Sequence, residues 1–336
     1  MSEKNQTIKD NGINMSLARY EKNPILTRKD IPDIPPYILD PTSVFNPGAV
    51  KYKGCIKLML RVQTRGRRTY LCMAESTDGF EFQVCSKVVR FNGFDRLREK
   101  VFHVYDPRIT EIDRVFYVIF AMDMNRNCLL GLARTTNFED FDFIGIVSDE
   151  PNRNGVLFSE RIGGLYTRLD RPNRNPVAGD ISSGSRIVLS TSLDMVNWRS
   201  QGTVIAGRHH YWDEDIGAGP PPIKTREGWI LLYHGIARHF DSVNIYQAGV
   251  ILMDLKTPLV ILGRSRNNIL EPRAEYELIG QVPNVVFPSG IIVDEYDDEG
   301  FAKPDSRVLV YYGAADTSVA VATTTVRELI DLARND

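Results

Sequence analysis

The sequence predicts an all-β protein, a five-bladed β-propeller with a short C-terminal helix, and two observations lead to this prediction. Short stretches rich in Val, Ile, Tyr and Phe alternate with turns of Gly, Asn, Asp and Pro. A strand-turn-strand unit also recurs five times, and its closing segments begin at Ala74, Ala133 and Ser190, 59 and 57 residues apart. That period is too long for a solenoid and suits a four-stranded blade. A ring of blades hides its sheet edges, whereas a pair of packed sheets is the alternative fold.

Five pairs of predicted strands follow one another, and the first strand of each pair carries Pro or Gly. The pairs lie at residues 44–48 and 56–61, 105–108 and 115–120, 155–158 and 164–168, 217–220 and 229–234, and 285–288 and 308–313. A polar tail at residues 1–22 precedes them, so we expect one propeller domain over residues 23–336. Residues 326–334 form the predicted helix. The acidic insertion at residues 294–305 either packs against another subunit or caps a pocket.

Composition and charge exclude several classes of protein. The chain is 43% hydrophobic and 25% charged, which is typical of a globular protein, and Lys plus Arg (41) nearly balance Asp plus Glu (43). This balance gives no bulk attraction to nucleic acid or to an anionic membrane, so any anion site must be local. With no visible secretory signal and no apolar stretch of spanning length, we expect a soluble, cytoplasmic protein, with a homo-oligomer left open.

The cysteines predict neither a metal site nor disulfide bonds. Cys55, Cys72, Cys85 and Cys128 show no CxxC spacing and no clustering with the five histidines. We therefore expect reduced, largely buried thiols, no metal and no cofactor.

In a propeller, the inner strands of different blades converge at one mouth of the central channel. Polar residues at equivalent positions of the repeats should therefore meet in space. The equivalent positions hold Asn46, Asp106, Arg153 with Asn154, and Asp215 at the starts of the first strands, and Arg61, Arg171, His234 and Asp316 at the ends of the second strands. Charged side chains are costly to bury unless they are paired or bind a ligand. This set therefore favours a functional site over a channel that has only a structural role.

Three features of this set suggest chemistry. Pro107 stiffens the chain at Asp106, although an isolated Asp-Pro pair is more often only a local turn. Arg153 and Arg171, from one unit, can clamp an oxyanion such as phosphate, or else they pair with nearby carboxylates, of which the candidates are Asp170, Asp180 and Glu160. Aromatic side chains suit the faces of a sugar; the candidates are Tyr105, Tyr211, Trp212 and Tyr246. Of these, we expect Tyr105 to bind substrate.

Seven short motifs follow one another along the chain between residues 23 and 330. They are YDPR (105–108), NRNGVLF (152–158), RP (171–172), IGAGP (216–220), GWILLYHG (228–235), VPNVVFP (282–288) and YYGAADT (311–317). Together they resemble glycoside hydrolase family 130, the family of β-mannoside phosphorylases and related β-mannosidases. The resemblance implies a five-bladed propeller, in agreement with the repeat.

The resemblance also implies roles for individual residues. Asp106 corresponds to the general acid of these phosphorylases. Arg153 and Arg171 correspond to phosphate-binding arginines, and His234 faces the same pocket. Asn46, Arg61 and Asp316 correspond to residues that hold the mannosyl unit.

Two positions depart from the family pattern. Many of these phosphorylases carry a phosphate-binding lysine directly before IGAGP, where this chain has Asp215. An anion there should weaken a phosphate site, because like charges a few Å apart repel by a few kcal/mol at an effective dielectric of about 20. Asn46 is followed by Pro47 and Gly48, whereas several 1,4-mannoside phosphorylases have Asn-Ser, which suggests a branch that acts on 1,2-linked mannosides.

The leading hypothesis is inverting phosphorolysis of a short β-1,2- or β-1,4-linked mannoside, with Asp106 as proton donor, inorganic phosphate as co-substrate and α-mannose 1-phosphate as product. The alternative is an inverting β-mannosidase in which a carboxylate activates water; the candidate bases are Asp213, Glu214 and Asp215. A third hypothesis, a sugar-binding propeller without catalysis, gains nothing from a stiffly held acid that faces two arginines.

Overall fold

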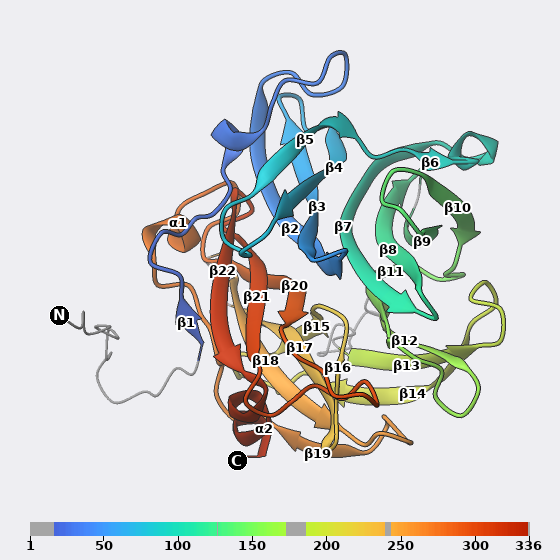
Figure 1. Cartoon of the computed structure of the whole chain (residues 1–336), viewed down its shortest axis with the longest axis vertical. Coiled ribbons are helices and arrows are strands. Elements are labelled where there is room, and N and C mark those ends of the chain that lie inside the picture. The colour runs from blue at the N-terminus through green and yellow to red at the C-terminus, as the bar shows by residue number, and fades with distance from the viewer. Residues whose placement is uncertain (1–16, 126, 173–185, 239–242, 335–336) are drawn as a thin grey trace.

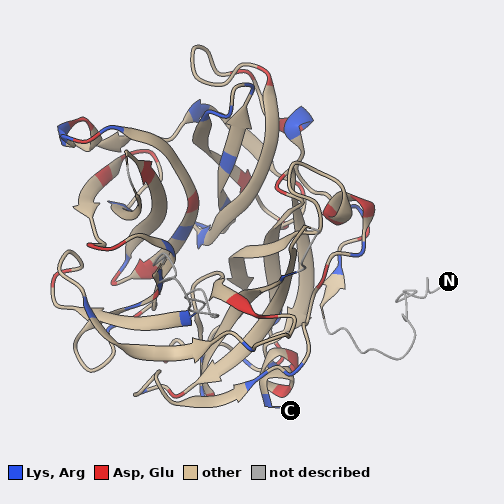
Figure 2. Ribbon diagram, turned by 180° about the vertical axis from the view of Figure 1, so that it is seen from behind, with Lys and Arg blue, Asp and Glu red and all other residues tan. Residues whose placement is uncertain are grey.

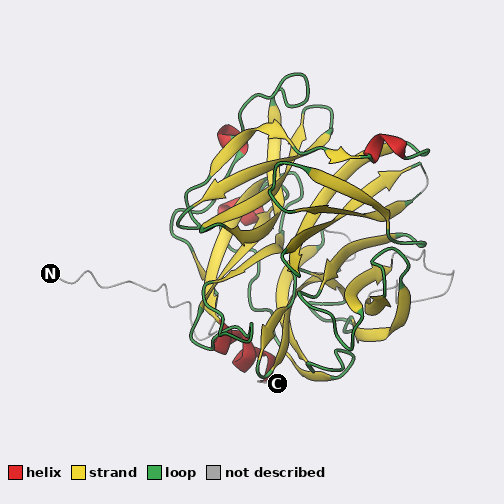
Figure 3. Ribbon diagram, turned by 45° about the vertical axis from the view of Figure 1, so that its right-hand side comes forward, coloured by secondary structure: helices red, strands yellow, loops and turns green. Residues whose placement is uncertain are grey.

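The structure is a computed structural model that describes residues 17–125, 127–172, 186–238 and 243–334. Its strands form five sheets arranged as a ring around a central axis (Figure 1). Strands dominate the described chain, and its helices are short (Figure 3). The prediction of an all-β, five-bladed propeller is therefore confirmed.

Each sheet is one blade, and its first strand lies innermost; first strands are in contact between the fifth and first, first and second, second and third, and third and fourth blades. The first blade contains β2 (Pro41–Tyr52), β3 (Cys55–Thr64), β4 (Thr69–Ser76) and β5 (Gln83–Val88). The second contains β7 (Val101–Ile112), β8 (Val115–Met124), β9 (Cys128–Thr135) and β10 (Phe141–Ile146), with β6 (Phe91–Asn92) at its edge. The third contains β11 (Asn152–Leu157), β12 (Tyr166–Pro172), β13 (Arg186–Ser192) and β14 (Arg199–Ala206).

The fourth and fifth blades complete the ring. The fourth contains β15 (Asp215–Ala218), β17 (Gly228–Ala237), β18 (Ile245–Met253) and β19 (Ile261–Arg264), with the short β16 (Ile223–Thr225) paired to β17. The fifth contains β20 (Val286–Val293), β21 (Arg307–Ala314) and β22 (Ser318–Thr325). All five predicted strand pairs are hydrogen-bonded neighbours in these sheets. Single-turn 3₁₀ helices lie at Arg28–Asp30 and Phe94–Arg96.

The N-terminal segment closes the ring. Strand β1 (Ala18–Arg19) pairs with β22, with Ala18 opposite Thr323, and forms the fourth strand of the last blade. The predicted boundary at residue 22 was therefore too late, because residues 18 and 19 belong to the propeller. A two-residue strand has no hydrophobic alternation that a sequence pattern could reveal.

The hydrophobic core is divided among the gaps between neighbouring blades. Among the described residues, one large cluster of buried apolar side chains lies between each pair of neighbours. Between the first and fifth blades, for example, Leu58 packs with Leu309 and Val321. Because the apolar faces are turned sideways against other blades, the strand ends at the channel mouth are left for polar residues.

The repeated closing segments form one kind of turn in the first three blades. The side-chain oxygens of Asp78, Asn137 and Asp194 each accept hydrogen bonds from two main-chain N–H groups that follow them. The next residue has a positive φ in each case; these residues are Gly79, Phe138 and Met195. The weak sequence repeat is therefore the repetition of an Asx-capped turn.

Helix α2 (Val326–Arg334) has the predicted bounds and packs an apolar face against the last two blades, with Leu329 and Ala333 fully buried. A second short helix, α1 (Glu275–Leu278), was not predicted. The 294–305 insertion leaves the end of the β20–β21 hairpin where Val293 pairs with Val308, opposite the end where Ala314 leads to Asp316. It therefore does not cap the pocket that contains Asp316.

The distribution of surface charge and the state of the cysteines can be compared with what the composition predicts. Basic and acidic segments are interspersed around the ring (Figure 2). No helix in the described ranges is long and apolar enough to cross a membrane. All four cysteines are free; Cys72 and Cys128 are buried, and Cys55 and Cys85 are partly exposed.

Candidate active site

Three inner strands carry the same irregularity at one mouth of the channel. In β2, β7 and β11, two residues oppose a single residue of the next strand, and the slip follows Phe45, Tyr105 and Arg153. The first residue of each bulge is Asn46, Asp106 or Asn154, with φ of 48°, 52° and 55°. A bulge re-aims a side chain, and left-handed backbone at a residue other than glycine is strained. Equivalent polar side chains of three successive blades are thus turned out of their sheets together.

Asp106 is anchored by two neighbours from the first blade. The Nδ2 of Asn46 donates to Oδ1 of Asp106 at 3.0 Å, and Nη1 of Arg61 donates to the same oxygen at 2.9 Å. The Asp106 side chain is only 12% exposed. Because both bonds end on Oδ1, the carboxylate is fixed in direction while Oδ2 is the oxygen that can carry a proton toward a ligand.

Arg108, the last residue of the YDPR motif, holds the main chain of the β7 bulge in place. Its side chain is fully buried; Nη1 donates to the main-chain oxygen of Asp106 at 2.8 Å, and Nε donates to that of Gly219 at 2.9 Å. Burial lowers the pKa of Arg108 to about 10, and the nearby Asp106 opposes the effect. Sequence reasoning gave Arg108 no role, although its place in the motif was a usable signal. Its contacts stabilise the strained backbone that presents Asp106.

Tyr105 acts on the site through Arg61 and not through its hydroxyl. The guanidinium of Arg61 lies over the rings of Phe45 and Tyr105, at 4.3 and 4.6 Å from their centroids. The Tyr105 hydroxyl donates to Asp123 Oδ1 at 2.8 Å, and the residue is 6% exposed. That Tyr105 binds substrate stays a prediction; the structure adds that its hydroxyl is used inside the blade and that its ring supports Arg61.

Asp316 and Arg61 line a cavity of about 470 Å³ beside Asp106. Phe45, Gln63 and Gln281 also line it, and the Gln63 amide donates to the Gln281 side chain at 3.0 Å. Burial raises the pKa of Asp316 to about 6; Arg61 opposes this shift, and Asp106 adds to it. Arg65 and Arg67 line it as well, and a cavity lined by a carboxylate, guanidiniums and amides suits a ligand with many hydroxyl groups.

The two predicted phosphate-binding arginines lie side by side in the third blade. Arg153 on β11 is directly opposite Arg171 on β12. In the part of the chain that the structure describes, neither forms an ion pair: of the candidate partners, Asp170 pairs with Arg168 and Glu160 pairs with Lys224, each at 2.7 Å. The third candidate, Asp180, lies outside the described residues. Like charges on opposite strands destabilise a sheet, so the two guanidiniums form a place where an anion would be stabilised.

His234 is fully buried next to these arginines. Its ring lies 4.5 Å from that of Phe287, and neither ring nitrogen has a hydrogen-bond partner among the described residues. Burial lowers the pKa of His234 well below its usual value, and the charges of Arg171 and Arg108 lower it further. The imidazole is therefore neutral and offers one N–H donor. Gly217 leaves room for it, because a Cβ at residue 217 would lie 2.5 Å from the ring.

Tyr246 on β18 interacts electrostatically with both parts of the site, the arginine pair and the cavity that Asp316 lines. The pKa of its hydroxyl is raised by burial and is influenced by Arg171 on one side and Asp316 on the other. Its ring stacks with that of His234 at 6.3 Å. Tyr246 was only one of several candidate aromatics in the sequence, because the contacts that distinguish it come from three different blades.

The acidic residues 213–215 are each engaged with a basic partner. Asp213 has 0% exposure and accepts from Arg208 at 2.8 Å, Arg264 at 2.7 Å and the Tyr233 hydroxyl at 2.8 Å; these contacts come from a loop and two strands of the fourth blade. Glu214 lies 3.5 Å from His209. Asp215 lies at the start of the inner strand β15 and pairs with Arg238, a residue that sequence reasoning missed.

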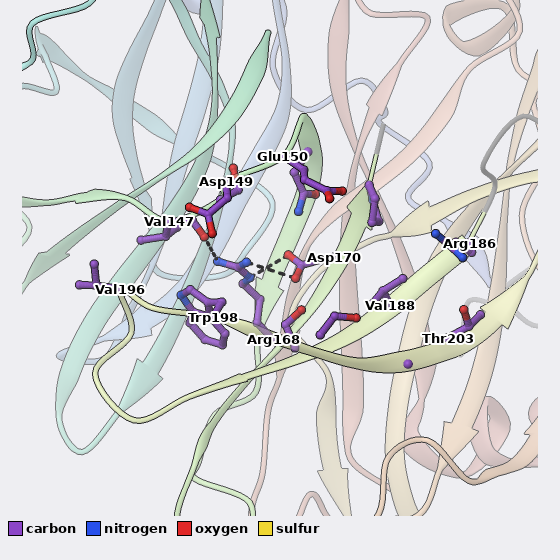
Figure 4. Close-up of a pocket in the computed structure, with 16 residues that line it drawn as sticks. Val147, Asp149, Glu150, Arg168, Asp170, Arg186, Val188, Val196, Trp198 and Thr203 are labelled. Carbon is purple, nitrogen blue, oxygen red and sulfur yellow. Dashed lines mark hydrogen bonds and ion pairs between the residues drawn. The ribbon is translucent and has the colours of Figure 1, made fainter. Parts of the chain in front are cut away.

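A second pocket, of about 320 Å³, opens on one face of the third blade (Figure 4). Arg168 lies at its centre, paired with Asp170 and stacked 4.1 Å from the ring of Trp198. Asn152 and Pro172 at its edge are the chain neighbours of Arg153 and Arg171. None of the predicted site residues lines it, so this pocket adjoins the site without forming it.

One group of side chains in the described ranges could share a metal ion. Ligand atoms of His209, His210 and Glu214 lie within 4.8 Å of one another, in the exposed turn before β15. Neither Asp106 nor the arginine pair belongs to this group.

Comparison with known proteins identifies the family. The family model for glycoside hydrolase family 130, described as beta-1,4-mannooligosaccharide phosphorylase, matches residues 16–335. The chain is 31% identical over 323 residues to the beta-1,4-mannooligosaccharide phosphorylase of Ruminococcus albus, covering 94% of this chain and 90% of that protein. It is 32% identical over 301 residues to the 1,2-beta-oligomannan phosphorylase of a Thermoanaerobacter species, covering 85% of this chain and 91% of that protein.

A solved structure is similar over nearly the whole chain. The beta-1,2-mannobiose phosphorylase of Listeria innocua, in complex with beta-1,2-mannobiose, matches with a TM-score of 0.81 and 26% identity, covering 95% of this chain and 99% of that one. Fold, site and relatives together define a glycoside phosphorylase, an enzyme that acts on glycosidic bonds. The chain belongs to glycoside hydrolase family 130, as its seven motifs predicted.

Proposed function

We propose that the protein catalyses inverting phosphorolysis of short β-1,2- or β-1,4-linked mannosides, with Asp106 as general acid. The observation that carries the proposal is the pair Arg153 and Arg171, two guanidiniums with no ion pair among the described residues, beside a neutral histidine at the mouth that also holds Asp106. The relatives support it, because they are named as phosphorylases of β-1,4- and β-1,2-linked mannosides.

The sugar is held on the side of the first blade. Arg61 and Asp316 line the polar cavity, and Asn46 and Arg61 both hold Asp106 beside it. A carboxylate accepts hydrogen bonds from sugar hydroxyls, and a guanidinium donates them, so the three residues orient the mannosyl unit. The glycosidic oxygen is then within reach of Asp106.

Phosphate is held on the side of the third blade. Arg153 and Arg171 offer guanidinium N–H groups that match the geometry of phosphate oxygens, and His234 adds a neutral donor. Phosphate attacks the anomeric carbon on the face opposite the leaving group, and Asp106 protonates the leaving oxygen, directly or through a sugar hydroxyl. The products are α-mannose 1-phosphate and a shorter sugar.

The hydrolytic alternative loses one of its three candidate bases. A general base must reach a water molecule next to the sugar, whereas Asp213 is buried among Arg208, Arg264 and Tyr233. Asp215, which Arg238 contacts through Oδ2, and Glu214, which lies near His209, are the bases left to this alternative, and the assay below tests it.

The test is an incubation with β-1,2-mannobiose and β-1,4-mannobiose, each with and without inorganic phosphate, followed by ³¹P and ¹H NMR. We expect mannose 1-phosphate in the α configuration only when phosphate is present, and the preferred disaccharide assigns the linkage. Free mannose released at equal rates in both conditions would overturn the proposal in favour of hydrolysis. Binding of mannobiose without any turnover would favour the non-catalytic propeller.

A further inference from the structure

An ion pair between Asp215 and Arg238 lies at the phosphate side of the site. Asp215 is 7% exposed and is directly opposite Ile236 in the pairing of β15 with β17. Arg238 lies two residues beyond Ile236, at the diagonal position that a long side chain can reach. Its Nε and Nη2 both contact Oδ2 of Asp215. The ion-pair partner of Asp215 therefore comes from the end of β17, the strand that pairs with β15.

Arg238 belongs to the same group of charges as the arginine pair. Burial lowers the pKa of Arg171; Asp215 opposes the shift, and the positive charges of Arg153 and Arg238 add to it. The geometry agrees, because β15, which begins with Asp215, contacts β11 and β12, which carry Arg153 and Arg171. Three guanidiniums around one carboxylate keep an excess of positive charge, which is what a phosphate dianion needs.

The ion pair changes how an aspartate at residue 215, in place of a lysine, affects the charge at the phosphate side of the site. Many phosphorylases of this family carry a lysine at this position, and an uncompensated aspartate there would repel phosphate. Here Arg238, next to the end of β17, neutralises the aspartate, so the ion pair adds no net charge to the site, while a positively charged group still lies at this position. The charge is carried by a guanidinium that is held in one direction, instead of by a flexible ammonium group.

We propose that Arg238, oriented by Asp215, provides the third cation of the phosphate site. The proposal rests on the phosphorolysis proposed above and names Arg238 as the residue that touches phosphate, with Asp215 as its positioning residue. A guanidinium donates more than one hydrogen bond to an oxyanion, whereas lysine acts as a point charge. The exchange thus preserves phosphate binding without the lysine.

The first experiment compares Arg238→Ala with wild type in steady-state kinetics with both substrates varied. We expect the KM for phosphate to rise about tenfold or more, the typical effect of losing a charge-assisted hydrogen bond. The KM for mannoside should change by less than about twofold, because Arg238 follows a strand of the fourth blade, whereas Arg61 and Asp316 belong to the first and fifth blades. Arg226→Ala is the matched control: this exposed arginine of the same blade pairs with Asp297 and Glu299 and should change neither constant.

A second variant separates lost binding from damaged folding. Asp215→Lys combined with Arg238→Ala places the lysine of the relatives in the pocket and should recover most of the phosphate affinity that Arg238→Ala alone loses. An unchanged KM for phosphate in Arg238→Ala, or an equal rise of both KM values, would overturn the proposal. So would a double variant no better than Arg238→Ala.

Calorimetric titration of the wild type, Arg238→Ala and Arg226→Ala with inorganic phosphate alone distinguishes this proposal from the proposed reaction. If the wild type releases mannose without phosphate, the reaction is wrong, but the titration still tests the site. Weaker phosphate binding in Arg238→Ala than in Arg226→Ala supports the third cation, and equal binding in the two variants contradicts it.

Discussion

The two sides of the channel mouth are built in opposite ways. On the side of the first blade, Asn46 and Arg61 are hydrogen-bonded to Asp106, and Arg61 is stacked on two aromatic rings. On the side of the third blade, Arg153 and Arg171 lie opposite each other without an ion pair among the described residues, beside a histidine whose nitrogens are unpaired. On the first side the charges are paired with one another, whereas among the described residues the two arginines of the other side have no carboxylate partner.

The difference follows from the charge of the proposed ligands. A neutral sugar cannot compensate a buried charge, so the charges that orient it must compensate one another, as Arg61 and Asp106 do. Phosphate brings its own negative charge, so its site can hold cations that repel one another until the anion arrives. Substitutions should therefore affect function on both sides but stability in opposite directions.

The largest effect is expected for Asp106→Asn. The amide keeps the shape of the side chain and can still contact Arg61 and Asn46, but it cannot donate an acidic proton. We expect kcat to fall by about 10²–10⁴-fold, the usual contribution of a general acid, while mannobiose binding measured by calorimetry is retained. Activity within about threefold of wild type would show that Asp106 only positions the sugar. Asp123→Asn, which alters a carboxylate bonded to Tyr105 in the same blade, is the control.

The second-largest effect is expected when Arg171→Met is compared with Arg61→Met. Arg171 and Arg61 lie at equivalent ends of the second strands of their blades. Arg171→Met should raise the KM for phosphate by about tenfold or more while leaving urea stability equal to or above that of wild type, because it removes a like-charge pair. Arg61→Met should instead raise the KM for mannoside and lower the free energy of unfolding by about 1–3 kcal/mol, because Asp106 loses its cation. If both variants lose stability equally, the contrast between the two sides is wrong.

The smallest effect is the pH dependence that Asp316 imposes on sugar binding. Burial, with a contribution from Asp106, raises the pKa of Asp316 to about 6, so its carboxyl is protonated below that pH and ionised above it. The ionised group accepts stronger hydrogen bonds from hydroxyl groups, so the KM for mannoside should fall several-fold as pH rises through about 6. Asp316→Asn should remove this step from the pH profile. A wild-type profile that is flat between about pH 5 and pH 7 would contradict the assignment.

The same group should act on stability with the opposite sign. The folded protein keeps the Asp316 proton up to about pH 6, whereas the unfolded chain releases it near the usual value of 3.8. The free energy of unfolding should therefore decline as pH rises from about 4 to about 6. Asp316→Asn removes this decline, so it should exceed wild type by about 1–3 kcal/mol in urea unfolding at neutral pH, with no difference near pH 4.

Much of the site could be read from the sequence because it depends on repetition. Asn46 and Asp106 occupy the same place in consecutive repeats, and the inner strands of a propeller must converge. The structure shows that both residues begin a bulge and that the two side chains are hydrogen-bonded. The positive φ at these positions was not visible, since Pro107 indicated only an extended conformation.

The residues that were missed or misjudged have in common that their partners lie on other strands. Tyr105 stays a predicted substrate contact, but the bond of its hydroxyl to Asp123 on β8 was not visible in the sequence. Asp215 looked like the loss of a cation, but Arg238 at the end of β17 compensates it. No local pattern signals an ion pair between residues 23 positions apart in sequence.

By itself, the sequence determined the number of blades, the strand pairs, the terminal helix and the family, because these depend on periodicity and on contiguous motifs. Only the tertiary structure decided which charges are paired and which are left for a ligand. The physical reason is that the energy of a charge depends on its neighbours within a few Å, and in a ring of blades those neighbours come from distant parts of the chain. Arg61 with Asp106 and Arg153 with Arg171 illustrate the two outcomes at one mouth of the same channel.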